Sequence, residues 1–214
     1  GSFMLAEAMF THGLDRRIAY GALSSRAVGG SPTRILLVFG AVATGISMWI
    51  SNTATTAMMF PIGLSIVAHL TKGRESEQAS RNFATAMMLM AAFGASIGGL
   101  GTPIGTPPNL IGKGMLERIA HQNISFFQWM LVGVPLTLLL FAFLVLYFRW
   151  RLLKGLHVDL SQAAHIQAEL KKLGPVSAGQ RNTLVAFGTT VALWLFPGAL
   201  AIAGLLGWYG YSQL

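Results

Sequence analysis

The 214-residue sequence contains no cysteine and very little charge. The absence of cysteine excludes disulfides, thiolate metal sites and a cysteine nucleophile. Only 10% of the residues are charged and 53% are hydrophobic, whereas a soluble domain carries about 25% charged residues. This composition predicts an all-α integral membrane protein that crosses the cell (inner or plasma) membrane several times.

Acidic and basic side chains are both absent from the four apolar stretches that follow Arg34. These stretches are 35–70, 83–112, 126–148 and 183–214. Proton-driven carriers usually depend on a carboxylate or histidine within the membrane, so neutral ligands favour Na⁺ over H⁺ as a coupling ion. No nucleophile–base pair or metal-ligand cluster lies at membrane depth, and an enzyme is therefore a poor fit.

The longest of these stretches, 35–70, is far longer than the about 20 residues that one spanning helix needs. Its apolar arms, 35–50 and 57–70, would reach only about 24 and 21 Å as helices. We expect a re-entrant hairpin (35–71) whose polar tip, 51–56, lies near mid-membrane. The alternative is one kinked helix whose Ser and Thr hydroxyls bond to its own backbone.

The placement of the basic residues favours the hairpin. If the hairpin re-enters, thirteen of the fifteen Lys and Arg residues lie on one side of the membrane, Arg34, Lys72 and Arg74 among them. A single crossing would instead leave six on one side and nine on the other. The positive-inside rule favours the first arrangement. The net charge of +8 is then a topology signal, and no nucleic-acid partner is expected.

A second interrupted segment follows in the stretch 83–112. Residues 94–109 contain five glycines and three prolines, which cannot continue a straight helix. We expect an unwound, protein-buried crossing here. Gly94 and Gly98 form a GxxxG step, which allows close helix packing. No Gly-Lys-Ser/Thr sequence follows the glycines, so this segment does not match a phosphate-binding loop.

The other segments are assigned by hydropathy and charge. Residues 113–125 are expected to form a short outer loop. Both ends of the sequence fall within apolar segments, which indicates a fragment of a longer protein. The remaining assignments are the end of a scaffold helix with a cytoplasmic connector (1–34), a transmembrane helix (126–150), a second cytoplasmic connector (151–182) and the start of a second repeat (183–214).

Two interrupted segments with their breaks at mid-membrane are typical of a secondary transporter. Helix N-termini offer free N–H groups to an anion, and unwound carbonyls and hydroxyls offer oxygen ligands to Na⁺. Ser47 and Ser51 share one helix face, and with Asn52 they could supply oxygens to a small cation. The same spacing would also suit two serines that close a helix–helix contact.

A family resemblance rests on two motifs. Ser-Asn-Thr at 51–53 follows Met-Trp-Ile at 48–50, and Gly-Thr-Pro-Pro-Asn occupies 105–109. Together they resemble the N-terminal half of the divalent anion:sodium symporter family, the sodium-coupled di- and tricarboxylate carriers. The resemblance covers nearly the whole chain. It implies the inverted-repeat fold of the ion transporter superfamily, an elevator-type transport domain and a homodimer at full length.

The resemblance also implies the binding residues. The positions that match Na⁺ ligands are Ser47, Ser51, Asn52 and Gly105. The positions that match the contacts to a substrate carboxylate are Asn52, Thr53, Thr106 and Pro107. The family's second hairpin and second broken helix are absent from this sequence, and with them the second Na⁺ site and half of the substrate site.

The expected function is sodium-coupled import of dicarboxylates of the succinate, malate and fumarate class. Its partners would be a dicarboxylate anion, Na⁺ and membrane lipid. A dicarboxylate exchanger or a sulfate or tricarboxylate carrier of the same fold is an alternative. A membrane-embedded structural subunit without transport is an alternative from another class, and it would tolerate loss of the Asn52 side chain.

Overall fold

The computed structural model describes residues 2–24, 28, 31–70, 77–121, 123–153 and 163–202. Within these ranges every regular element is a helix, as expected. The expectations for Lys72, Arg74 and 203–214 lie outside the described residues. The helices are α1 (Ser2–Thr11), α2 (Leu14–Leu23), α3 (Pro32–Ser47), α4 (Asn52–Leu70), α5 (Glu77–Gly98), α6 (Pro107–Ile119), α7 (Phe126–Arg151), α8 (Ala163–Lys172) and α9 (Ala178–Ile202).

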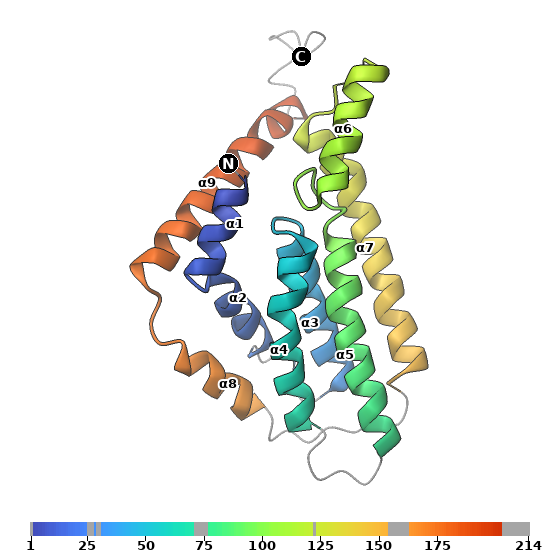
Figure 1. Cartoon of the computed structure of the whole chain (residues 1–214), viewed down its shortest axis with the longest axis vertical. Coiled ribbons are helices and arrows are strands. Elements are labelled where there is room, and N and C mark those ends of the chain that lie inside the picture. The colour runs from blue at the N-terminus through green and yellow to red at the C-terminus, as the bar shows by residue number, and fades with distance from the viewer. Residues whose placement is uncertain are drawn as a thin grey trace.

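Helices α3 and α4 run antiparallel and are joined by the short turn 48–51 (Figure 1). Pro32 occupies the first turn of α3, where its missing N–H removes no helical bond. The Ser51 hydroxyl accepts a hydrogen bond from the Ala54 N–H at 3.3 Å and so caps the start of α4. The expected tip at 51–56 is therefore wrong in its extent, because residues 52–56 are already helical. Re-entry of this hairpin into the membrane stays a prediction.

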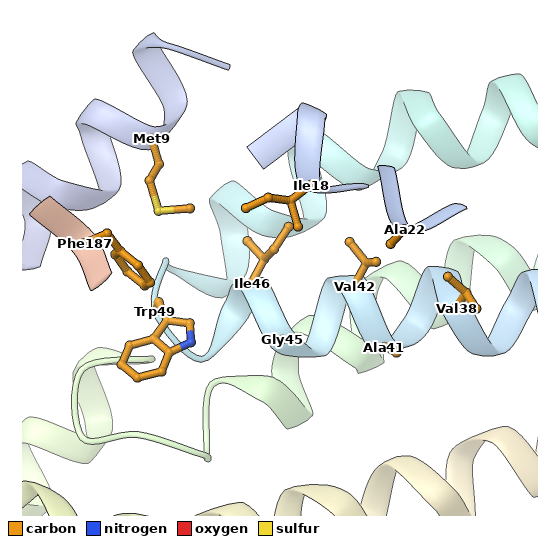
Figure 2. A pocket seen from close by; sticks show the side chains of 10 residues that line it. All are labelled: Met9, Ile18, Ala22, Val38, Ala41, Val42, Gly45, Ile46, Trp49 and Phe187. Atoms are coloured by element: carbon orange, nitrogen blue, oxygen red, sulfur yellow. The ribbon is translucent and has the colours of Figure 1, made fainter. Parts of the chain in front are cut away.

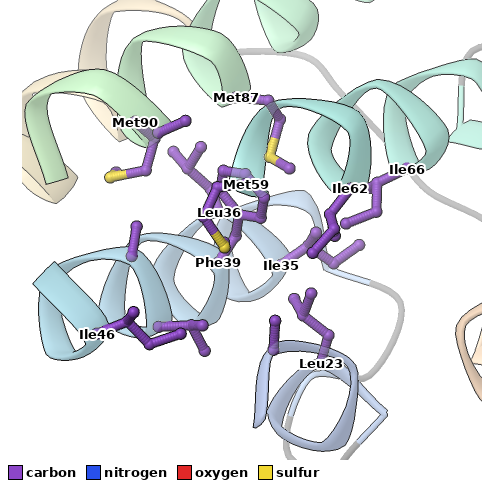
Figure 3. Close-up of a cluster of buried hydrophobic side chains, with 14 of the residues drawn as sticks. Leu23, Ile35, Leu36, Phe39, Ile46, Met59, Ile62, Ile66, Met87 and Met90 are labelled. Carbon is purple, nitrogen blue, oxygen red and sulfur yellow. The ribbon is translucent and has the colours of Figure 1, made fainter. Parts of the chain in front are cut away.

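The main core lies where α3, α4 and α5 pack together. Phe39, Met59 and Met90 are fully buried there, and Figure 3 shows them converging from the three helices. Gly94 and Gly98 of α5 face α3: a Cβ atom on Gly98 would lie 2.1 Å from the Thr44 carbonyl oxygen. The expected close packing at the GxxxG step is confirmed.

The break between α5 and α6 is shorter than the sequence indicates. Helix α5 continues to Gly98, and α6 begins at Pro107, so only 99–106 are non-helical. The glycines at 94 and 98 stay helical because packing against α3 outweighs their low helix propensity. The expected outer loop at 113–125 is also corrected, since α6 runs on to Ile119.

Helix α7 begins at a complete capping box, in which Ser125 and Gln128 exchange side-chain and backbone hydrogen bonds. Its 26 residues give a length of about 39 Å, and the expected spanning helix is confirmed in length and apolarity. It is the one helix among the described residues that is long and apolar enough to cross a membrane. The turn between α3 and α4 lies beside the α5–α6 break, level with the first half of α7 (Figure 1).

The connectors are tied to each other by one arginine. Arg17 of α2 donates to the Gln180 side chain at 2.8 Å and to the Leu173 and Gly174 carbonyls at 2.9 Å. Gly174 turns the chain between α8 and α9 with a φ of 64°, which favours glycine. Near Arg17, Asp15 is buried, and this burial raises the pKa of its carboxyl above the usual range.

Candidate functional site

The tip of the α3–α4 hairpin meets the α5–α6 break at Asn52. The Ser47 hydroxyl donates to the Asn52 side-chain oxygen at 2.8 Å. A Cβ atom on Gly99 would lie only 2.3 Å from that same oxygen, so the break approaches Asn52 more closely than any residue with a side chain would allow. The Thr102 hydroxyl donates to the Met48 carbonyl. These contacts place the two interrupted segments against each other.

Gly105 reaches the same cluster through Gly99. A Cβ atom on Gly105 would lie 2.6 Å from the Gly99 carbonyl oxygen. Three of the expected Na⁺ ligands, Ser47, Asn52 and Gly105, therefore gather around Gly99. Ser51 differs, since its side chain is exposed and its hydroxyl caps α4. A Ser51 ligand would require its oxygen to serve the cation and the Ala54 N–H together.

The oxygen atoms around Gly99 are suitable ligands for a monovalent hard cation such as Na⁺. They are hydroxyl, amide and carbonyl oxygens, which are the ligand types that unwound transporter helices offer to Na⁺. No group of three or more His, Cys, Asp or Glu occurs within the described ranges, so the usual ligand sets of zinc are not found there. The lack of a side chain at Gly99 and Gly105 lets the oxygens around Gly99 approach one another, because a Cβ atom at either position would collide with one of them.

The broken segment is held by side chains that the sequence analysis missed. The Asn109 amide donates to the Gly99 and Thr102 carbonyls at 2.7 and 2.9 Å. From α7, the Trp129 indole donates to the Leu100 carbonyl at 3.1 Å. Asn109 had one signal in the sequence: it is an amide directly after Pro-Pro in a charge-free stretch, and such a group needs partners at membrane depth.

The contacts to α7 place the break along that helix. Trp129, which bonds to the Leu100 carbonyl of the break, lies about 5 Å along α7 from its first residue, and Thr137, which bonds to the Ile97 carbonyl at the end of α5, lies about 16 Å along it. The break is therefore near the beginning of α7, and its expected mid-membrane depth stays a prediction.

The expected substrate residues fall into two groups. Asn52 and Thr53 line an open cavity of about 650 Å³ between α4 and α5. Thr106 and Pro107 lie outside that cavity, at the start of α6. Thr106 is extended there, and two prolines follow it. Because Pro107 and Pro108 have no N–H, the Thr106 hydroxyl is a donor that the start of α6 can still offer to an anion.

Two further hydroxyls are buried in the hairpin. The side-chain oxygens of Thr44 and Thr55 have no hydrogen-bond partner among the described residues. Thr44 faces Gly94 across the α3–α5 contact, where a Cβ atom on Gly94 would lie 3.4 Å from the Thr44 hydroxyl. Thr55 falls within the expected polar tip 51–56, whereas Thr44 was not expected, since a threonine inside a helical stretch carries no signal of its burial.

Comparison with known proteins gives a consistent result. A model of the sodium:sulfate symporter transmembrane region matches residues 1–208. The sodium-dependent dicarboxylate transporter SdcS of Staphylococcus saprophyticus is 36% identical over 200 residues, which are 91% of this chain and 38% of that protein. SdcS of Staphylococcus aureus strain NCTC 8325 is 35% identical over the same extent. The chain thus spans less than half the length of these relatives.

Proposed function

Because the chain belongs to the sodium:sulfate symporter family, we propose that the full-length protein imports dicarboxylates of the succinate class together with Na⁺. The observation that carries the proposal is the junction at Asn52. There, Ser47 holds the Asn52 amide against Gly99 of the broken segment. The similarity to sodium-dependent dicarboxylate transporters supports the choice of substrate and ion.

In this proposal Na⁺ binds between the hairpin tip and the break. Its ligands would be oxygens of Ser47, Ser51, Asn52 and Gly105. The two stretches that form the site, 35–70 and 83–112, contain no Arg or Lys. A bound Na⁺ would therefore supply the positive charge beside the anion. The Ser47 hydroxyl orients the Asn52 side chain, and Gly99 allows the break to approach it. Binding of the cation would therefore favour binding of the anion.

The dicarboxylate would be held by the starts of two helices. Asn52 and Thr53 offer side-chain donors and the first N–H groups of α4, which have no intrahelical partner. Thr106 and Pro107 would form the second contact at the start of α6, where the positive end of the helix dipole favours an anion. The part of the family's length that this chain does not span would complete the site.

We further propose an elevator-type movement in a homodimer. Helices α3, α4 and α5 share one buried core (Figure 3), which supports their moving as a single body. Helix α7 would move with this body, because Trp129 and Thr137 bond to the Leu100 and Ile97 carbonyls, and the Asn52 junction would then keep its hydrogen bonds.

The test is uptake of labelled succinate by the full-length protein in proteoliposomes. We expect uptake with an inward Na⁺ gradient, and none when K⁺ replaces Na⁺. Asn52→Ala should reduce Na⁺-driven uptake by at least tenfold, because it removes both the side-chain oxygen offered to the cation and the side-chain N–H offered to the anion. Asn82→Ala is the matched control: it deletes the same side chain near the start of α5, where Asn82 bonds only to Gln78 among the described residues.

Four other outcomes would change the proposal. Uptake that ignores Na⁺ but needs internal dicarboxylate would identify an exchanger. Folded protein that takes up sulfate or citrate but no succinate would refute the dicarboxylate assignment. Full activity of folded Asn52→Ala would refute the role of the hairpin tip, and the absence of any uptake would favour a structural subunit.

A further inference from the structure

A second cavity lies on the other face of α3, away from the Asn52 junction. It has a volume of about 410 Å³, within the about 300–1,000 Å³ that is usual for ligand pockets. Figure 2 shows α1 and α2 on one side, α3 on the other, and Phe187 of α9 at one end. The lining residues are Met9, Ile18, Ala22, Val38, Ala41, Val42, Gly45, Ile46, Trp49 and Phe187. We call this cavity the α2–α3 groove.

The α2–α3 groove is poorly suited to water. Nine of its ten lining residues have no polar side-chain atom, and the exception is the single N–H of Trp49. A water molecule inside a protein needs two to four polar partners. The groove therefore suits an apolar ligand. Two of its lining residues, Ala41 and Gly45, are exposed, so a ligand can reach the groove from outside.

The length of the groove matches one leaflet of a bilayer. From Val38 to Trp49 it follows α3 for about 16 Å. Half of a hydrocarbon core of about 30 Å is about 15 Å. At the far end Trp49 packs edge-on against Phe187 with ring centroids 5.4 Å apart, which closes the groove. An acyl chain that entered beside Val38 would fill it as far as these rings.

A basic residue lies one helical turn before the Val38 end of the groove. Arg34 precedes Val38 by one helical turn, so both lie on the same side of α3. It is exposed, and the two ion pairs found among the described residues involve Arg81 and Lys113 instead. Arg34 is therefore available to an anionic headgroup, whose acyl chain would then lie in the groove.

We propose that the α2–α3 groove binds one acyl chain of an anionic phospholipid whose headgroup contacts Arg34. This site is separate from the ion and substrate site and does not depend on its assignment. The lipid would fill the contact between the connector helices α1–α2 and the α3–α5 body. Lipid composition would thereby influence how these two parts pack.

The test uses the full-length protein, delipidated in detergent and then mixed with phosphatidylglycerol or phosphatidylcholine, with bound lipid counted by native mass spectrometry. Gly45→Leu should abolish one tightly bound phosphatidylglycerol, because a side chain at this position meets open space and would occupy the groove. Gly112→Leu is the matched control, since it also meets open space but lies on α6. Arg34→Gln should weaken phosphatidylglycerol binding about fivefold and leave phosphatidylcholine binding unchanged.

Ala41→Leu serves as a second filling variant if Gly45→Leu does not elute as folded protein. Equal lipid binding by either folded filling variant and by Gly112→Leu would overturn the proposal. So would a wild-type protein that binds no phosphatidylglycerol, since another part of the full-length protein would then fill the groove. Arg34→Gln with unchanged preference for phosphatidylglycerol would overturn the headgroup contact.

Discussion

The contact between Gly98 and Thr44 fixes the distance from the hairpin to the broken segment, and Gly98→Ala should disrupt it. The new Cβ atom would lie 2.1 Å from the Thr44 carbonyl oxygen and 2.8 and 2.9 Å from its carbonyl carbon and Cα. All three are backbone atoms of α3, so no side chain can rotate away. A separation of 3.0 Å is the least that real Cβ atoms show, and α5 must therefore retreat from α3 by about 0.9 Å.

The energetic result follows from overpacking. An extra methyl group in a tightly packed core costs about 1–3 kcal/mol, against a helix-propensity gain of at most about 1 kcal/mol from Gly to Ala. We expect a clear drop in the apparent melting temperature of the full-length protein in detergent. Na⁺-dependent uptake should fall as well, because Gly99 moves away from Asn52.

Gly94→Ala is the control for this variant. It lies one turn earlier on α5, and its new Cβ atom would meet the Gly40 oxygen and the Thr44 hydroxyl at 3.4 Å, which is ordinary contact. Gly94→Ala should therefore melt at the wild-type temperature or slightly above it. If Gly98→Ala matches Gly94→Ala in both melting and uptake, the close approach of α3 and α5 does not exist in the protein.

Two more variants test the break and the connectors. Asn109→Ala leaves the buried Gly99 carbonyl without its partner, at about 1–3 kcal/mol, whereas the Thr102 carbonyl keeps the Gly105 N–H at 3.3 Å. The variant should lower the melting temperature and weaken Na⁺ affinity in uptake assays; wild-type Na⁺ affinity would contradict the anchoring role. Asp15→Asn should raise the melting temperature at pH 7. Burial raises the pKa of Asp15, so its ionisation costs stability as the pH rises above the unfolded value of 3.8, and the gain should vanish below that pH.

The sequence located the two interrupted segments because the signals there are compositional. Long charge-free stretches with polar or glycine- and proline-rich centres identified the α3–α4 turn and the α5–α6 break. The exact limits were wrong, since Gly98 is held helical by its contact with Thr44, a residue more than fifty positions away in the chain. Local propensity contains no information about such a partner.

The arrangement of the candidate site was predictable only in part. Ser47, Asn52 and Gly105 lie close together, and their role as Na⁺ ligands stays a prediction. The side chains that hold the break were not foreseen: the partners of Trp129 and Asn109 are carbonyls, which every residue has, and only the fold decides which of them lie within reach. The exposed position of Ser51 follows from its role at the start of α4.

The hydrogen bonds from Asn109 and Trp129 have a thermodynamic consequence for the proposed Na⁺ site. Fixing the backbone of a residue costs about 1–2 kcal/mol in conformational entropy. In the broken segment part of this cost is met during folding, because these two side chains hold the Gly99, Leu100 and Thr102 carbonyls. With Na⁺ bound there as proposed, the binding free energy would go into affinity instead of into ordering a flexible loop.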